Sequence, residues 1–78
     1  MIGYIEGAVK AIRNTNAIIL AGSVGYTVHS TKETLAGLSI GAQASFWTHL
    51  AVRENSQDLY GFINEDELRF FDLLLTVS

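Results

Sequence analysis

Residues 48–62 read THLAVRENSQDLYGF and contain two apolar runs joined by a polar loop. Apolar and polar residues alternate along residues 44–53, which predicts a strand with one buried face. The residues predicted to face inward are Ala44, Phe46, Leu50 and Val52, and those predicted to face outward are Ser45, Trp47, His49 and Arg53. Residues 59–62, LYGF, are predicted to form a last short strand. The loop between the two strands opens on Arg53-Glu54, an opposite-charge pair at an exposed tip, and its role needs an explanation.

The same alternation predicts two earlier strands, at residues 1–12 and 24–30, and the short continuous apolar run AIILA predicts another at residues 17–21. Glycines inside the first strand, Gly3 and Gly7, indicate a bend or bulge of the kind that lets a small barrel coil. Between the second and third strands, Gly22-Ser23 is typical of a two-residue hairpin turn with glycine first. In the third strand, Val24, Tyr26 and Val28 are predicted to share one face.

Two segments have helical features. Residues 30–35, STKETL, are weakly helical, with Ser or Thr as the N-cap. The stronger helix begins after Asn64, because Glu67 follows three residues later, as in a capping box, and acidic residues fill the first turn. Its predicted apolar stripe is Leu68, Phe71, Leu74 and Leu75, and its predicted polar face is Glu65, Arg69, Asp72 and Thr76.

About five short strands followed by a terminal helix indicate an all-β fold with a C-terminal helix. The best match is a small, five-stranded, partly open Greek-key barrel of the OB type. An SH3-like barrel would give almost the same pattern, and periodicity alone does not separate the two folds.

The composition predicts self-association rather than tight DNA binding. Charged residues make up 17% of the chain, below the ~25% that is typical of soluble domains, and the mean hydropathy is +0.27. Such a chain is expected to expose apolar surface that a second subunit covers. The net charge is −3, whereas a stand-alone duplex binder normally carries a basic stripe. The cations are scattered along the chain: Lys10, Arg13, Lys32, Arg53 and Arg69.

Several other classes of protein are disfavoured. The chain has no cysteine, so it has no disulfide or thiolate metal site, and a reducing cytosol is its natural compartment. The long uncharged runs show strand periodicity and are interrupted by polar residues, which argues against membrane spans, and the N-terminus does not resemble a signal peptide. No residue pattern indicates a catalytic group, metal or cofactor: His29 and His49 are predicted at outward strand positions, and the acidic residues 65–67 are explained by helix capping.

Four segments together resemble a known family. They are MIGYIEG at residues 1–7, GSVGYTVH at 22–29, the THLAVRE and LYGF segments, and RFFDLLLTVS at 69–78. Their order along almost the whole chain resembles the N-terminal domain of the RuvA family, whose members bind Holliday junctions in bacteria. The resemblance implies an OB-fold oligomerisation domain over residues 1–63. It also implies that residues 64–78 begin a helical DNA-binding domain and stop before its helix–hairpin–helix elements.

The resemblance also implies a role for the loop. In the family, this loop carries acidic residues that form a pin at the centre of the junction, which makes Arg53, Glu54 and Asn55 the candidate site residues. A carboxylate near a phosphate costs roughly 1 kcal/mol per close pair in a water-like medium. An acidic pin would therefore keep a continuous duplex from crossing the centre. Here Glu54 is followed by Asn55, so one acidic residue stands where the family commonly has two.

The resemblance therefore implies a non-catalytic, tetramer-forming part of a branch-migration helicase complex in DNA recombination and repair. The implied partners are further copies of the chain (a homotetramer, and an octamer for the full-length protein), four-way junction DNA, a RuvB-type ATPase motor and a RuvC-type resolvase. The implied location is the bacterial cytoplasm. The alternative is a stand-alone OB module that binds single-stranded nucleic acid, with Trp47 as a base-stacking platform instead of a packing residue.

Overall fold

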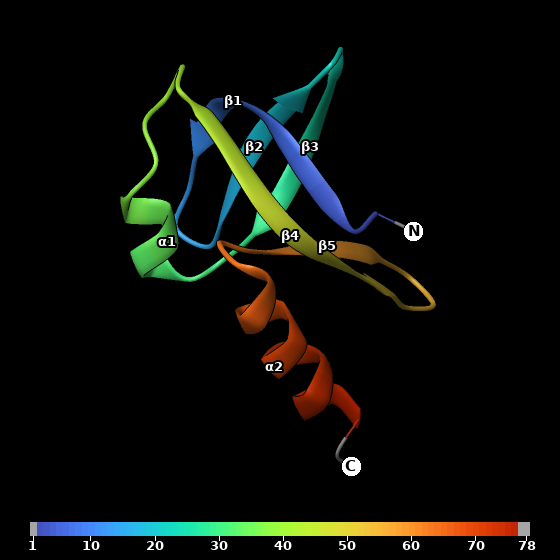
Figure 1. The fold of residues 1–78 in the computed structure, drawn as a ribbon. Coiled ribbons are helices and arrows are strands. Elements are labelled where there is room, and N and C mark those ends of the chain that lie inside the picture. The colour runs from blue at the N-terminus through green and yellow to red at the C-terminus, as the bar shows by residue number, and fades with distance from the viewer. Residues whose placement is uncertain (1, 77–78) are drawn as a thin grey trace.

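The computed structural model describes residues 2–76, with the backbone alone for Thr76. Its elements in chain order are β1 (Tyr4–Ile12), β2 (Asn16–Ala21), β3 (Val24–His29), α1 (Lys32–Ala36), β4 (Gln43–Val52), β5 (Gln57–Phe62) and α2 (Glu65–Thr76). All the predicted strands and both predicted helices are therefore present. Figure 1 shows the strands wrapped into a barrel, with α1 on one side of it and α2 extending away from it.

The strands form a closed barrel in the order β1-β2-β3-β5-β4. Neighbouring strands are antiparallel except for β3 and β5, which pair in parallel at Val28–Leu59 and His29–Tyr60. The barrel closes where β1 pairs with β4, from Tyr4–Trp47 to Ala8–Gln43. This five-stranded Greek-key barrel with a C-terminal helix confirms the predicted OB-type fold.

Strand β1 pairs with β2 along one edge and with β4 along the other, and the glycines of β1 help it to follow the curve of the barrel. The sequence placed a bend or bulge of this strand at Gly3 and Gly7, whereas the pairing between β1 and β2 shifts register between Val9 and Ala11. At Gly7 the strands approach so closely that a Cβ atom would collide with the backbone carbonyl of Leu20. At the next turn, Gly22 has a φ of 64°, as the predicted glycine-first hairpin requires.

The core lies inside the barrel, and of the positions predicted to face inward Phe46 is fully buried while Ala44 and Leu50 pack against the core. Its fully buried large side chains are Phe46, Ile19, Val9 and Val28. One inward prediction was wrong: Val52 is 65% exposed. The N–H of Thr48 still donates a hydrogen bond to the carbonyl of Gly3, but the residues of β4 after it pair only with β5, so Val52 lies on a two-stranded ribbon outside the core. Thr48 is buried instead, and its hydroxyl donates a 2.7 Å hydrogen bond to the carbonyl of Ile2.

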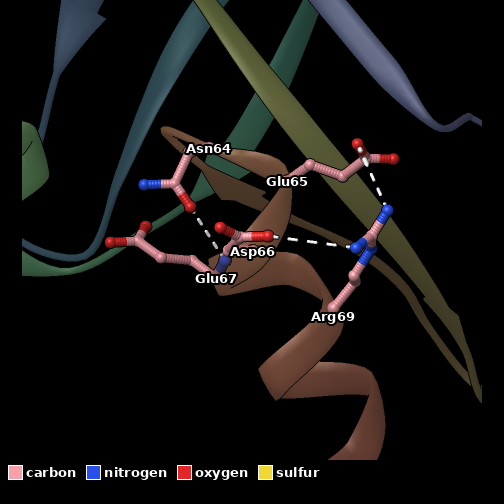
Figure 2. Close-up of polar contacts among 5 residues, drawn as sticks. All are labelled: Asn64, Glu65, Asp66, Glu67 and Arg69. Atoms are coloured by element: carbon pink, nitrogen blue, oxygen red, sulfur yellow. Dashed lines mark hydrogen bonds and ion pairs between the residues drawn. The ribbon is translucent and has the colours of Figure 1, made fainter.

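Helix α2 begins as the sequence predicts. The side-chain oxygen of Asn64 accepts a hydrogen bond of 2.9 Å from the backbone N–H of Glu67, and Glu65, Asp66 and Glu67 occupy the first turn (Figure 2). Arg69 lies 3.8 Å from Glu65 and 4.0 Å from Asp66, as the i,i+4 and i,i+3 spacings allow. The shorter α1 is capped by Thr31, whose hydroxyl accepts from the N–H of Thr34.

The faces of α2 are rotated from the prediction. Phe71 docks the helix on the barrel through ring contacts with Phe62 at 5.0 Å, His49 at 5.4 Å and Tyr60 at 5.6 Å. Asp72, which was predicted on the polar face, approaches His49 of β4. Of the predicted apolar stripe, Leu68 and Phe71 are half-buried, whereas Leu74 and Leu75 are each 55% exposed. In the part of the chain that the structure describes, neither helix has the length and apolar character needed to cross a bilayer.

Candidate nucleic-acid interface

The loop between β4 and β5 lies at the end of a long hairpin. The two strands pair from Trp47–Phe62 to Val52–Gln57, and the N–H of Arg53 then donates a 2.7 Å hydrogen bond to the carbonyl of Ser56. This bond leaves Glu54 and Asn55 as the two residues at the tip. Figure 1 shows the hairpin extending past the rest of the barrel, so the tip is held away from the core by a paired ribbon.

The tip is open to solvent and its charges are not paired with each other. Every residue from Val52 to Gln57 is exposed. Among the ion pairs found within residues 2–76, none involves Arg53 or Glu54. The carboxylate of Glu54 is therefore available to act on a charged partner that approaches the tip.

A second acidic residue of the hairpin, Asp58, does not reinforce the tip. Its carboxylate lies 3.7 Å from Nε2 of His29 on β3, and both side chains are about 30% exposed, at 29% and 31%. Asp58 thus contributes to the contact between β3 and β5 at the base of the ribbon. The tip of one chain carries a single carboxylate, that of Glu54.

The cations do not surround this tip. Arg13 and Lys32 line one shallow cavity of about 330 Å³ between the β1–β2 turn and α1. In Figure 1, α1 and the β4–β5 loop lie on opposite sides of the molecule. Arg69 is on α2, next to Glu65 and Asp66. Within residues 2–76, Arg13 and Lys32 thus lie apart from Arg53 and Arg69, and these cations do not form the basic stripe that a duplex requires.

The sequence analysis also considered one tryptophan and two histidines as candidate functional residues. In the structure these side chains make packing contacts. Trp47 is half-buried and stands edge-on to Tyr4 across the β1–β4 pair, with ring centroids 5.0 Å apart. His29 packs beside Tyr60, and His49 packs beside Phe71. Within residues 2–76, no three His, Asp or Glu side chains converge as a metal site requires.

Sequence reasoning did not foresee two features of this surface. The pairing of His49 with Asp72 joins residues 23 positions apart, and no local pattern indicates it. A groove between α1 and α2, with Glu33, Asp66 and Glu67 among its lining residues, depends on how α2 docks. The sequence does contain one signal for this groove. Phe and Leu residues occur on both sides of α2, and a helix that buries a single apolar stripe has fewer of them.

Comparisons with known proteins show the family of the chain. A family model described as the RuvA N-terminal domain matches residues 1–61. The chain is 46% identical over 78 residues to a Streptomyces griseus protein and 45% identical to one from Deinococcus radiodurans, each named Holliday junction branch migration complex subunit RuvA. All of the chain is covered in both matches, but it spans only 38% and 39% of the length of these relatives. A model match over most of the chain, on a closed five-stranded barrel, shows that the chain belongs to the RuvA N-terminal domain family.

Proposed function

We propose that this chain is the barrel part of a Holliday-junction branch-migration subunit. In this proposal residues 1–63 form the oligomerisation domain, and residues 64–78 begin the helical domain that follows it. The names of the relatives support the assignment, and the family match ends at residue 61, close to the proposed boundary. The chain would serve DNA recombination and repair as a non-catalytic subunit, with ATP hydrolysis in a RuvB-type motor.

The observation that carries the proposal is the exposed, unpaired Glu54 at the tip of the β4–β5 hairpin. In a four-fold assembly each subunit would bring one such carboxylate to the junction centre, with Arg53 and Asn55 beside it. The carboxylates would repel phosphates there and keep the exchanging strands apart. Attraction to the DNA would come from helix–hairpin–helix elements of the longer protein.

Self-association in this proposal depends on exposed apolar side chains of the barrel. Ile40 is 69% exposed, Val52 65% and Val24 50%, and large apolar residues exposed to this degree are typical of surfaces that subunits cover. We propose a homotetramer, with an octamer for the full-length protein. A RuvC-type resolvase is a further proposed partner, and the bacterial cytoplasm is the proposed location.

The test of the tip uses a chimera in which residues 1–78 replace the matching segment of the Streptomyces griseus relative. Glu54→Gln removes the charge and keeps the shape of the side chain. We expect binding to linear duplex to tighten about fivefold, as the loss of a repulsion of about 1 kcal/mol predicts, with a smaller change for a four-way junction. Glu33→Gln on α1, far from the tip, is the control for a loss of one negative charge. Equal changes for both DNA forms would refute the role of Glu54.

The alternative of a stand-alone single-strand binder is tested with the 78-residue chain itself. A titration with single-stranded oligonucleotides should leave the fluorescence of Trp47 unchanged, because this ring packs on Tyr4. Strong, salt-sensitive quenching would favour the alternative. Sedimentation of the same sample shows whether the chain assembles alone.

A further inference from the structure

Asn55 lies at the tip of the β4–β5 hairpin beside Glu54, and Ser56 follows it. An asparagine can lose its side-chain amide without an enzyme when the backbone nitrogen of the next residue attacks the side-chain carbonyl carbon. The attack needs an asparagine that can turn freely, a following residue that is not bulky and a following N–H that no hydrogen bond holds. The chain has four asparagines on which these requirements can be compared, at positions 14, 16, 55 and 64.

Asn55 meets all three requirements. It and Ser56 are exposed, and within residues 2–76 the side chain of Asn55 forms no hydrogen bond. The tip is closed by a bond from the N–H of Arg53 to the carbonyl of Ser56, whereas the N–H of Ser56 donates to no group of these residues. Serine has one heavy atom on Cβ, so it crowds its own nitrogen less than a branched residue does. Because exposed tips of polar residues are also where a chain moves most easily, the Ser56 nitrogen can approach the side chain of Asn55.

Two of the other asparagines are held by the fold. Asn16 begins β2, where its side-chain amide donates a 3.4 Å hydrogen bond to the hydroxyl of Thr15. The nitrogen that would attack Asn16 belongs to Ala17, which is 0% exposed. At the start of α2, Oδ1 of Asn64 accepts the capping bond from the N–H of Glu67, which holds this side chain over the end of the helix. Neither side chain can turn towards the next nitrogen without losing these contacts.

Asn14 is the closest competitor, because it is exposed in the turn between β1 and β2. It is followed by Thr15, whose branched Cβ carries two heavy atoms next to the attacking nitrogen and hinders its approach. Of the four asparagines, Asn55 therefore alone combines exposure with a small following residue whose N–H is unbonded.

We propose that Asn55 is a site of spontaneous deamidation, which changes the hairpin tip from one carboxylate to two. In the first step the Ser56 nitrogen bonds to Cγ of Asn55, the Cγ–Nδ2 bond breaks, and ammonia leaves with the proton of the Ser56 N–H. In the second step water opens the resulting five-membered ring at either of its two carbonyl carbons. One opening gives aspartate, and the other gives isoaspartate, in which the main chain runs through Cγ. Together the two steps convert one amide and one water into a carboxylate and an ammonium ion, and no oxidant or reductant is needed.

The new charge lies next to the carboxylate of Glu54. The unmodified chain has a net charge of −3, and each modified chain carries one negative charge more, placed at the exposed tip. A second carboxylate there adds to the repulsion of any phosphate that approaches. This consequence rests on the function proposed for the tip, in which Glu54 repels phosphates, and deamidation would strengthen that repulsion as the protein ages. The chemistry at Asn55 itself does not depend on that function.

The experiment incubates the 78-residue chain and the chimera described above, and it locates the lost amide by mass spectrometry. Trypsin cleaves after Lys and Arg, which separates a peptide of residues 14–32 from a peptide of residues 54–69. We expect the second peptide to change first, with the new carboxylate at Asn55 and not at Asn64. The rate should rise about tenfold for each pH unit above neutral, because the Ser56 nitrogen attacks only after it loses its proton.

Two variants of Ser56 test the attacking nitrogen, and both keep the carbonyl that closes the tip. Ser56→Gly should speed the loss of the amide roughly tenfold, because no side chain then crowds the nitrogen. Ser56→Val should slow it roughly tenfold, because its Cβ is branched. The inference is overturned if Asn14 or Asn64 loses its amide first, or if neither variant alters the rate. Modification of the short chain alone would equally reject it, since the tip would then be covered in the longer protein.

A separate measurement tests the consequence for DNA. Asn55→Asp in the chimera reproduces the aspartate product and should weaken binding to linear duplex about fivefold, which corresponds to about 1 kcal/mol of added repulsion. Asn14→Asp, beside α1 on the other side of the molecule, adds the same charge and should leave duplex binding unchanged. If Asn55 loses its amide but Asn55→Asp binds duplex like the unmodified chimera, the deamidation site stands and the repulsive role proposed for the tip fails.

Discussion

His49 on β4 places its Nδ1 atom 3.0 Å from Oδ1 of Asp72 on α2, and this contact joins the barrel to the terminal helix. Asp72 Oδ1 is shielded from solvent and no hydrogen bond from residues 2–76 reaches it, so its 3.0 Å contact with His49 is an ion-pair contact without hydrogen-bond alignment. Two atoms that both lack a proton would repel at this distance, so the contact is favourable only in the tautomer whose proton is on Nδ1 of His49. The neighbouring ring of Phe71, 5.4 Å from the His49 ring, keeps the imidazole in place.

The first prediction concerns this contact. A double-mutant cycle of His49→Ala and Asp72→Ala should give a coupling of about 0.5–1 kcal/mol in the free energy of unfolding, modest because the Asp72 side chain is 49% exposed. The same cycle for Arg69→Ala and Asp66→Ala should give almost none, because those side chains are 72% and 93% exposed. Nitrogen-15 NMR should find Nδ1 of His49 protonated at neutral pH. An unprotonated Nδ1 would contradict the assignment.

The second prediction compares one substitution at two exposures. Val28→Ala should lower the free energy of unfolding by about 2 kcal/mol, because Val28 is 0% exposed and its methyl groups leave a cavity in the barrel. Val52→Ala should change it by less than about 0.5 kcal/mol, because that side chain is 65% exposed. Urea unfolding of the two variants measures both values. Similar losses would mean that the end of β4 is buried.

The third prediction concerns the closest approach of two strands. Gly7→Ala should destabilise the fold by about 1–3 kcal/mol, because the new Cβ atom meets the carbonyl of Leu20, and a backbone group cannot turn aside as a side chain can. Gly3→Ala is the control in the same part of the chain, since nothing lies within 4 Å of a Cβ there. Thermal unfolding distinguishes the two. A stable Gly7→Ala variant would show that β1 and β2 can separate at no cost.

The fourth prediction concerns the start of α2. Asn64→Ala removes the acceptor that caps the N–H of Glu67, at a local cost of about 1 kcal/mol. Amide hydrogen exchange at Glu67 should therefore become about fivefold faster, while exchange in the barrel core stays the same. Asn55→Ala at the hairpin tip is the control, and it should leave α2 unaffected. Unchanged exchange at Glu67 would show that the acidic first turn holds the helix without the cap.

Much of the fold could be predicted because its signals are local. Gly22 permits the positive φ of the β2–β3 turn, and Asn64 accepts a bond from a residue three positions later. The alternation around Phe46 likewise follows from strand geometry alone. For the candidate site, the sequence also located Glu54 at an exposed tip. A polar loop that joins two paired strands lies at the end of the hairpin, where its residues contact solvent.

The wrong predictions occur where a distant segment decides the environment. Val52 has the inward parity of β4, but β1 has already ended its pairing at Trp47, so no strand covers it. Asp72 has the spacing of a solvent-facing residue, but the docking of Phe71 turns it towards His49. The segments that decide these two environments are β1 for Val52 and His49 for Asp72. Both are distant in sequence, so periodicity carried no information about them.

The sequence by itself determined which segments are strands and helices, with their ends placed to within about three residues, since backbone dihedrals and caps depend on residues within a few positions. Tertiary structure alone decided the closing partner of β1, the face of α2 that meets the barrel and the acidic groove beside it. Those outcomes depend on contacts between segments far apart in the chain, which become adjacent only when the barrel closes.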